Sequence, residues 1–420
     1  MANEFLKLME TDNEYILFDG DYLKLYKVPK EKIADIRDFM AKPRERHFAG
    51  IEIPDRLNRL TLCVTSVCNL ACKYCYEGEQ NCPEHKTPFI SYETIRKTID
   101  FVLSLYKEGI NCVQFFGGEP LLNVKGIRYT IDYIAEACRK LSLETPAYTI
   151  VTNGTLMTDE IHELFNEHFG RVTFSLDGRK EINDTNRVFA SGKGSMYDAV
   201  AANLKKYEKD RKYYVDVQMT VTESQLAEED PDITDFLHIK DLGAGNVQIS
   251  PLINTKDYQV AERDRYTSRI ISYFRKCYDH EIRNIDKSNY YKLLSLVQVL
   301  KEHTPTDHYC GAGFRDISVD TEGNIFPCFM FNENPAFIMG NVDGGPEEFL
   351  RNREIYLNNT ISRNEKCAKC WAHGMCSSGH AGCIGSYYLE NGTINQPIDY
   401  NCQLTKSTFE DALCKIAKFA

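Results

Sequence analysis

Beyond residue 60, short apolar runs alternate with stretches in which apolar residues recur every three or four positions. Runs rich in β-branched and aromatic residues predict strands, and the spaced pattern predicts amphipathic helices. A strand followed by a helix, repeated six times, is typical of parallel βα units and of an α/β fold. The six predicted strands are Leu62–Val67, Cys112–Phe116, Tyr148–Val151, Val172–Leu176, Val215–Val221 and Val247–Ile249.

The N-terminal residues 1–57 follow a different pattern. Tyr15–Asp19 and Tyr22–Val28 flank a short Asp/Gly turn, and a helical pattern follows from Lys30 to Met40. These features predict a small α+β hairpin-plus-helix unit.

The chain therefore divides into four predicted parts. After Cys310 it is rich in Gly and Asn and has few long periodic stretches, and bound metal would help such a segment to fold. The parts are the N-terminal unit 1–57, a partial (β/α)6 TIM barrel 58–260, a helical connector 261–305 and a metal-binding C-terminal domain 306–420.

Unusual residues gather directly after the predicted strands. In parallel βα barrels the chemistry collects in the loops at the C-terminal ends of the strands. Each of these segments also has the composition of a turn, so one alone would indicate little. In chain order they are a three-cysteine loop, Gly117–Pro120, Thr152–Thr155 and Asp177–Gly178.

Composition narrows the classes of function. A formal charge of −11 and the lack of a basic patch argue against nucleic acid as a partner. No apolar run of about 18 residues and no signal peptide is present, which predicts a cytoplasmic protein without a membrane span. Sixteen cysteines in such a chain favour metal binding over disulfides.

Three of these cysteines lie in one short loop, with the spacing Cys68-x3-Cys72-x2-Cys75. Three thiolates can hold three irons of a [4Fe–4S] cluster and leave the fourth iron open to a substrate. The alternatives are three buried thiols or a partial zinc site.

The segment CNLACKYC at 68–75, together with GGEP at 117–120, resembles the radical S-adenosylmethionine (SAM) enzymes. The resemblance implies that the open iron binds SAM, that one electron cleaves it, and that a 5′-deoxyadenosyl radical then abstracts hydrogen. The protein's part is binding and orientation.

The same resemblance implies a set of SAM contacts. The Gly117-Gly118-Glu119 turn would meet the amino group, and Arg187 would pair with the carboxylate. A strand-end serine, a surface arginine and an asparagine in a turn are the alternatives for three of the candidates. The complete set is Tyr74, Gly117, Gly118, Glu119, Asn153, Ser175 and Arg187.

The C-terminal cysteines resemble the SPASM extension, which carries two auxiliary iron–sulfur clusters. The chain departs from that pattern at one position, where His380 stands and Cys383 follows three residues later, so either could be the ligand. Zinc is the rival metal, because Cys-x2-Cys followed by more Cys and His is also zinc spacing. The candidate ligands are Cys310, Cys328, Cys367, Cys370, Cys376, Cys383 and Cys402.

Seven cysteines cannot fill two sites of four ligands. The resemblance implies an outer cluster on Cys367, Cys370, Cys376 and Cys402. The remaining three cysteines would hold an inner cluster, whose last position is left to a substrate thiolate, His380 or water.

A SPASM segment behind a hairpin-plus-helix unit resembles maturases that form Cys thioether crosslinks in ribosomally made precursor peptides. This implies a peptide substrate, whose leader could add a strand to the N-terminal unit, and an external electron donor such as flavodoxin or ferredoxin. The alternatives are an anaerobic sulfatase maturase that forms formylglycine, and a non-catalytic iron–sulfur or zinc scaffold.

Overall fold

The computed structural model describes residues 5–42, 53–77, 87–254, 259–284, 288, 290–302, 306–332, 334–376 and 381–417. Six parallel strands form the centre of the molecule. They are β4 (Arg56–Thr65), β5 (Gly109–Gly117), β6 (Ala147–Thr152), β7 (Phe169–Ser175), β8 (Tyr214–Val221) and β9 (Asn246–Pro251). They pair in chain order, each with the next. The predicted α/β fold with a partial (β/α)6 barrel is confirmed, and all six predicted strands are present.

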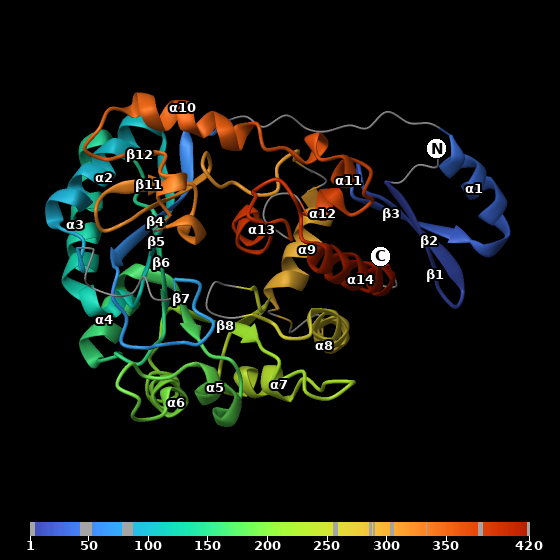
Figure 1. The fold of residues 1–420 in the computed structure, drawn as a ribbon, viewed down its shortest axis with the longest axis horizontal. Helices are drawn as coiled ribbons and strands as arrows, with labels where there is room; N and C mark the ends of the chain where they lie inside the picture. The colour runs from blue at the N-terminus through green and yellow to red at the C-terminus, as the bar shows by residue number, and fades with distance from the viewer. Residues whose placement is uncertain are drawn as a thin grey trace.

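Six helices connect these strands and cover the outer side of the curved sheet (Figure 1). They are α2 (Tyr92–Leu105), α3 (Val124–Leu141), α4 (Asp159–His168), α5 (Lys180–Asn186), α6 (Met196–Lys206) and α7 (Thr234–Asp241). Ser91 begins α2 as an N-cap, because its hydroxyl accepts a hydrogen bond from the Thr94 amide at 2.9 Å. The apolar face of α2, including Ile95 and Ile99, is buried against the sheet. These six helices therefore cover neither the C-terminal ends of the strands nor the inner side of the sheet, which other segments contact.

The C-terminal part extends the central sheet. The strands β10 (Asp316–Val319), β11 (Asn324–Phe326) and β12 (Gly340–Asn341) continue it beyond β4, and β10 pairs with β4 in parallel. The helices after β9 are α8 (Arg263–Arg283), α9 (Tyr291–Glu302), α10 (Pro346–Leu357), α11 (Glu365–Ala368), α12 (His373–Cys376), α13 (Ile384–Asn391) and α14 (Asp399–Ile416). Short 3₁₀ helices lie at Lys30–Lys32, Pro120–Asn123, Phe329–Phe331, Pro335–Phe337 and Ile361–Arg363.

The length of α14 was not expected from the sequence. This 18-residue helix packs against α8, whereas the chain after Cys310 was predicted to hold few long periodic stretches. Its buried face includes Thr405 and Thr408 besides apolar residues. Because threonine counts as a polar residue, the sequence does not show the helical periodicity of the buried face. None of the described helices is long and apolar enough to cross a membrane.

The N-terminal unit contains one more strand than the predicted hairpin-plus-helix. Its sheet consists of β1 (Leu6–Glu10), β2 (Glu14–Asp19) and β3 (Lys24–Pro29) in that order, followed by α1 (Ile33–Ala41). The strand β1 was missed because its five residues, LKLME, fit a short helix as well as a strand. Figure 1 shows this unit beside α11 and α12, away from the six parallel strands.

Candidate functional site

The three-cysteine loop directly follows β4 and is held by backbone hydrogen bonds. The amide of Ala71 donates to the carbonyl of Val188 at 2.8 Å, and that of Lys73 donates to Asn186 at 3.0 Å. The segment that follows α5 therefore fixes the loop along its length. Cys68, Cys72 and Cys75 are all half-buried.

The three thiols of this loop lie close enough to influence one another. Burial, with smaller contributions from the neighbouring Glu119, Cys72 and Cys75, raises the pKa of Cys68 to about 12. Burial also raises the pKa of Cys72, against the effect of Arg187. Thiols in such surroundings ionise only with a compensating cation, such as bound iron.

No group of three His, Cys, Asp or Glu side chains that could hold a single metal ion occurs among the described residues. In an iron–sulfur cluster each cysteine binds a different iron, so its thiolates stand further apart than around one ion. Among the described residues, the lack of such a group therefore argues against a site for a single metal ion, but it does not argue against a cluster. Three mutually close thiols on a fixed loop fit a cluster with one iron left open.

The Gly117–Gly118 turn is a consequence of close backbone packing. Gly117 has φ +123°, and a Cβ there would stand 2.0 Å from the carbonyl oxygen of Thr65. A Cβ on Gly118 would stand 2.3 Å from the carbonyl oxygen of Val67. Both glycines are therefore required for the end of β5 to lie against the start of the cysteine loop.

Glu119 is fully buried, and its carboxylate is used within the protein. One oxygen accepts hydrogen bonds from the Leu121 amide and the Thr152 hydroxyl, and the other accepts from the Asn153 amide at 2.7 Å. Burial raises the pKa of Glu119 to about 7, although these three donors oppose the rise. The side chain joins the ends of β5 and β6, and both of its carboxylate oxygens are occupied by groups of the protein.

Asn153 connects the third strand end to the cysteine loop. Its amide nitrogen donates to Asn69 at 2.8 Å and lies 3.9 Å from the Cys68 sulfur. Its oxygen accepts from the backbone and hydroxyl of Thr155. Ser175 ends β7 at the same edge of the sheet, where it pairs with Gln218. The structure thus brings both candidates to the strand ends around the loop.

Arg187 forms a buried ion pair that the sequence did not predict. Its guanidinium lies 3.0 Å from Asp177, and the exposed fractions of the two side chains are 9% and 0%. The Tyr74 hydroxyl donates to the other oxygen of Asp177, and the guanidinium lies 5.4 Å above the Tyr74 ring. Burial lowers the pKa of Arg187, but Asp177, Tyr74 and Cys72 together outweigh burial, so this pKa lies above its ordinary value.

Asp177 is therefore a further residue of the candidate site, which the sequence analysis did not include among the site residues. Its position directly after the fourth strand was the available signal, but aspartate before glycine is also an ordinary turn. Within the described residues, Arg187 Nε remains buried without a hydrogen-bond partner. The guanidinium can accept one more anionic group.

The C-terminal cysteines form two groups in the structure. Cys310, Cys328 and Cys383 make the inner group: burial and Cys383 raise the pKa of Cys310 to about 12, and burial followed by the other two raises that of Cys328. The sulfur of Cys383 lies 3.5 Å from that of Met330. His380, the alternative ligand, lies outside the described residues.

The outer group is a second set of neighbouring cysteines in the C-terminal part of the chain. It consists of Cys367, Cys370, Cys376 and Cys402. Burial raises the pKa of Cys376, and the other three members raise it further. Burial likewise raises the pKa of Cys402 to about 11. The structure brings together the four cysteines that the sequence grouped as one site.

Two buried tyrosines lie between these groups. Tyr309 directly precedes Cys310 of the inner group, yet its hydroxyl faces the outer group. Burial raises the pKa of Cys367, and the nearby Tyr309 hydroxyl opposes that rise. Within the described residues this buried hydroxyl has no hydrogen-bond partner. Tyr387 packs edge-on against Tyr309 at 5.3 Å between ring centroids.

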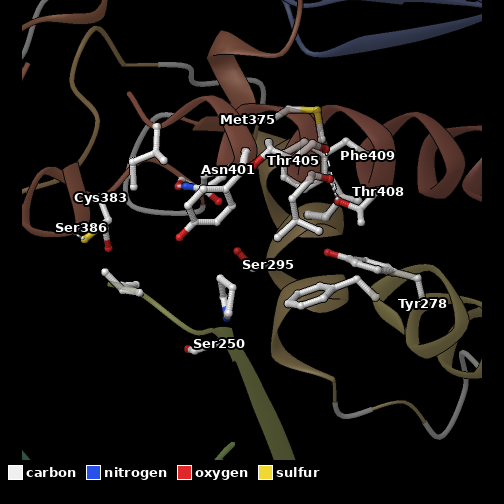
Figure 2. A pocket seen from close by; sticks show the side chains of 18 of the residues that line it. Ser250, Tyr278, Ser295, Met375, Cys383, Ser386, Asn401, Thr405, Thr408 and Phe409 are labelled. Carbon is white, nitrogen blue, oxygen red and sulfur yellow. Dashed lines mark hydrogen bonds between the residues drawn. The ribbon is translucent and has the colours of Figure 1, made fainter. Parts of the chain in front are cut away.

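A cavity of about 210 Å³ lies between the end of β9 and the C-terminal helices (Figure 2). Ser250 contributes from the end of β9 and Tyr278 from α8, while Asn401 and Thr405 contribute from α14. Cys383 of the inner group also lines it. The cavity therefore extends from the C-terminal end of β9 to one candidate cluster ligand.

Residues 62–228 match the Radical SAM superfamily. A segment of 146 residues is 36% identical to the uncharacterized protein MJ0907 of Methanocaldococcus jannaschii, and it covers 35% of this chain and about half (47%) of that protein.

Longer matches include two maturation proteins. The cysteine-type anaerobic sulfatase-maturating enzyme of Clostridium novyi is 25% identical over 391 residues, 87% of this chain and 97% of that protein. The antilisterial bacteriocin subtilosin biosynthesis protein AlbA of Bacillus subtilis is 26% identical over 340 residues, which cover 78% of this chain and 68% of that protein. The solved structure of anSMEcpe with bound AdoMet and the Cp18Cys peptide has a TM-score of 0.70, with 20% identity, over 87% of this chain and 99% of that one. This structural likeness concerns the fold.

Proposed function

We propose that this chain, whose residues 62–228 match the Radical SAM superfamily, is a peptide maturase that forms Cys thioether crosslinks. The observation that carries the proposal is the cavity that joins the end of β9 to Cys383. A substrate bound there would lie between the strand ends that surround the three-cysteine loop and the inner cysteine group.

Cys68, Cys72 and Cys75 are proposed to hold the catalytic cluster, which, with bound SAM, supplies a radical that abstracts hydrogen from carbon. Around it, the residues of the chain bind and orient. Arg187, whose Nε is still free to donate among the described residues, would receive the SAM carboxylate. The backbone of the Gly117–Glu119 turn would meet the amino group.

The inner cysteine group is proposed to bind the sulfur of the substrate. It offers three thiols, Cys310, Cys328 and Cys383, so one iron of a cluster would remain open to a soft ligand such as a substrate thiolate. The same position could be closed by His380 or by water. Cys383 lines the cavity, which supports ligation by the substrate sulfur, because a peptide bound in the cavity would already contact the inner cysteine group.

The outer cysteine group, Cys367, Cys370, Cys376 and Cys402, is proposed to hold a second auxiliary cluster with four protein ligands. Its electrons, and those for SAM cleavage, would come from an external donor such as flavodoxin or ferredoxin.

The N-terminal unit is proposed to bind the leader part of the precursor. In the sheet order β1-β2-β3, β3 is an edge strand, and it follows the exposed Tyr22 and carries the exposed Tyr26. Phe39 of α1 is also 41% exposed. An extended peptide could pair with the edge and pack against these rings.

Formylglycine formation is the second candidate function, because the sulfatase-maturating enzyme matches over 87% of the chain. Iron-reconstituted protein, SAM, reductant and a candidate Cys-containing peptide should be incubated anaerobically and analysed by mass spectrometry. A thioether removes two hydrogens, or about 2 Da per crosslink, and leaves no thiol to alkylate. A peptide aldehyde at the former cysteine would instead establish formylglycine and reject the crosslink.

A further inference from the structure

The N-terminal sheet lies directly on the loop that carries two of the outer cysteines. Cys370 and Cys376 enclose the segment 371–375, and the turn after β2 packs against it. Gly20 in this turn approaches so closely that a Cβ would stand 2.0 Å from the carbonyl oxygen of Trp371. The backbone itself forms this contact, so no larger residue fits.

Side chains of the same strands enclose Trp371. Its ring meets the fully buried Phe18 edge-on, with the ring centroids 5.9 Å apart. The Lys7 ammonium lies 5.7 Å above the tryptophan ring and 3.0 Å from Glu410 of α14. The N-terminal unit therefore contacts the cysteine loop and the helix beside it.

A buried polar connection runs from the turn to a cysteine. Asp21 Oδ1 lies 3.7 Å from His373 Nε2, and the exposed fractions of these side chains are 2% and 1%. On its other side, His373 Nδ1 lies 3.2 Å from the carbonyl oxygen of Cys370. One imidazole thus spans the distance from the N-terminal turn to the backbone of an outer cysteine.

We infer that the Gly20–Asp21 turn is a wall of the outer cysteine site and that Asp21 is a positioning residue, which holds His373 and through it the Cys370–Cys376 loop. Its consequence for a cluster rests on the proposed function. The positioning of the Cys370–Cys376 loop by the turn does not rest on the proposed function, because it follows from contacts between protein atoms. The buried Asp21 carboxylate lies within ion-pair distance of the His373 imidazole, and this contact links the turn to the cysteine loop.

The first experiment uses the full-length, iron-free protein. The Gly20→Ala variant inserts a Cβ into the contact with Trp371, and Gly170→Ala is its matched control, because a Cβ on Gly170 meets nothing within 4 Å. Labelling with iodoacetamide should be followed by mass spectrometry. Cys370 and Cys376 should react several-fold faster in Gly20→Ala than in Gly170→Ala, with Cys68 unchanged. Equal rates would overturn the inference.

A second variant keeps the test decisive if Gly20→Ala fails to fold. Asp21→Asn preserves size and removes the charge that faces His373. In the iron-free protein it should also expose Cys370 to labelling, and Asp21→Glu should restore part of the protection. Rates equal to wild type in Asp21→Asn would remove the positioning role.

Reconstituted protein separates this inference from the proposed function. In Asp21→Asn, the electron paramagnetic resonance signal of one auxiliary cluster should change, while that of the catalytic cluster stays as in wild type. Wild-type protein without a second auxiliary cluster would reject the proposed cluster, whereas the labelling result would still decide the role of the turn.

Discussion

The three-cysteine loop and the outer cysteine loop are held in place by different means. Backbone hydrogen bonds to residues 186–190 hold the first, and glycines and Glu119 of the next strand ends pack against it. The second depends on side chains and a turn from the N-terminal unit, at the opposite end of the chain. A site built on a parallel sheet is thus fixed by its neighbours in the barrel, whereas the outer site needs distant parts of the sequence to come together.

The strongest way to test this comparison is to remove a ligand of the first loop. Cys68→Ala should abolish production of 5′-deoxyadenosine, because the catalytic cluster would lose one of three protein ligands. Iron bound by the C-terminal cysteines should remain, since the two regions are held separately. Cys112→Ala, a cysteine of β5 outside the predicted ligand sets, is the control. Normal SAM cleavage by Cys68→Ala would contradict the assignment.

The next effect concerns the buried ion pair beside that loop. Arg187→Ala should lower the free energy of unfolding by about 3–5 kcal/mol, because the Asp177 carboxylate would stay buried without its positively charged partner. SAM affinity should fall as well. The exposed pair Arg128–Glu160 provides the control, and Arg128→Ala should change stability by only about 0–1 kcal/mol.

Chemical denaturation and SAM titration measure the two effects separately. A loss of SAM affinity with unchanged stability would mean that Arg187 serves the cofactor alone. A loss of stability with unchanged affinity would mean that it serves only Asp177.

A smaller effect is expected at Glu119. Glu119→Gln should cost about 1–3 kcal/mol, because one of three buried donors loses its acceptor. The variant also tests the pKa of about 7, raised from 4.5 by burial. Between these values the folded protein binds more protons at Glu119 than the unfolded chain, so this group favours folding at low pH, and its contribution declines as the pH rises toward 7.

Denaturation of both proteins from pH 4.5 to 8 provides the measurement. The stability difference, wild type minus variant, should fall by up to about 3 kcal/mol as the pH rises through this window. A difference that is constant with pH would show that Glu119 is ionised throughout.

Local patterns explain which parts of the molecule could be predicted. The six strands, the N-cap at Ser91 and the cysteine loop at a strand end follow from short stretches of sequence, and the structure contains them. Asp177 was not identified as a site residue, because its partner Arg187 is brought to it only by folding. The contact between Gly20 and Trp371 leaves no local signal in the sequence. Such pairs depend on tertiary structure rather than on periodicity.

The smallest expected effect concerns the hydroxyl of Tyr309, which lies at the outer group. Tyr309→Phe keeps the ring that packs on Tyr387 but removes the donor that faces Cys367. A hydrogen bond from this hydroxyl to a ligand thiolate would stabilise the reduced cluster, so removing the hydroxyl should lower the reduction potential. A bond worth about 0.5–1.5 kcal/mol corresponds to roughly 20–60 mV for one electron.

Redox titration with paramagnetic resonance detection should show the shift at one auxiliary cluster. The control variant Tyr278→Phe, which changes a buried tyrosine of α8, should show no shift. An unchanged potential in Tyr309→Phe would mean that the hydroxyl serves packing between the two cysteine groups and leaves the outer cluster's chemistry to its ligands.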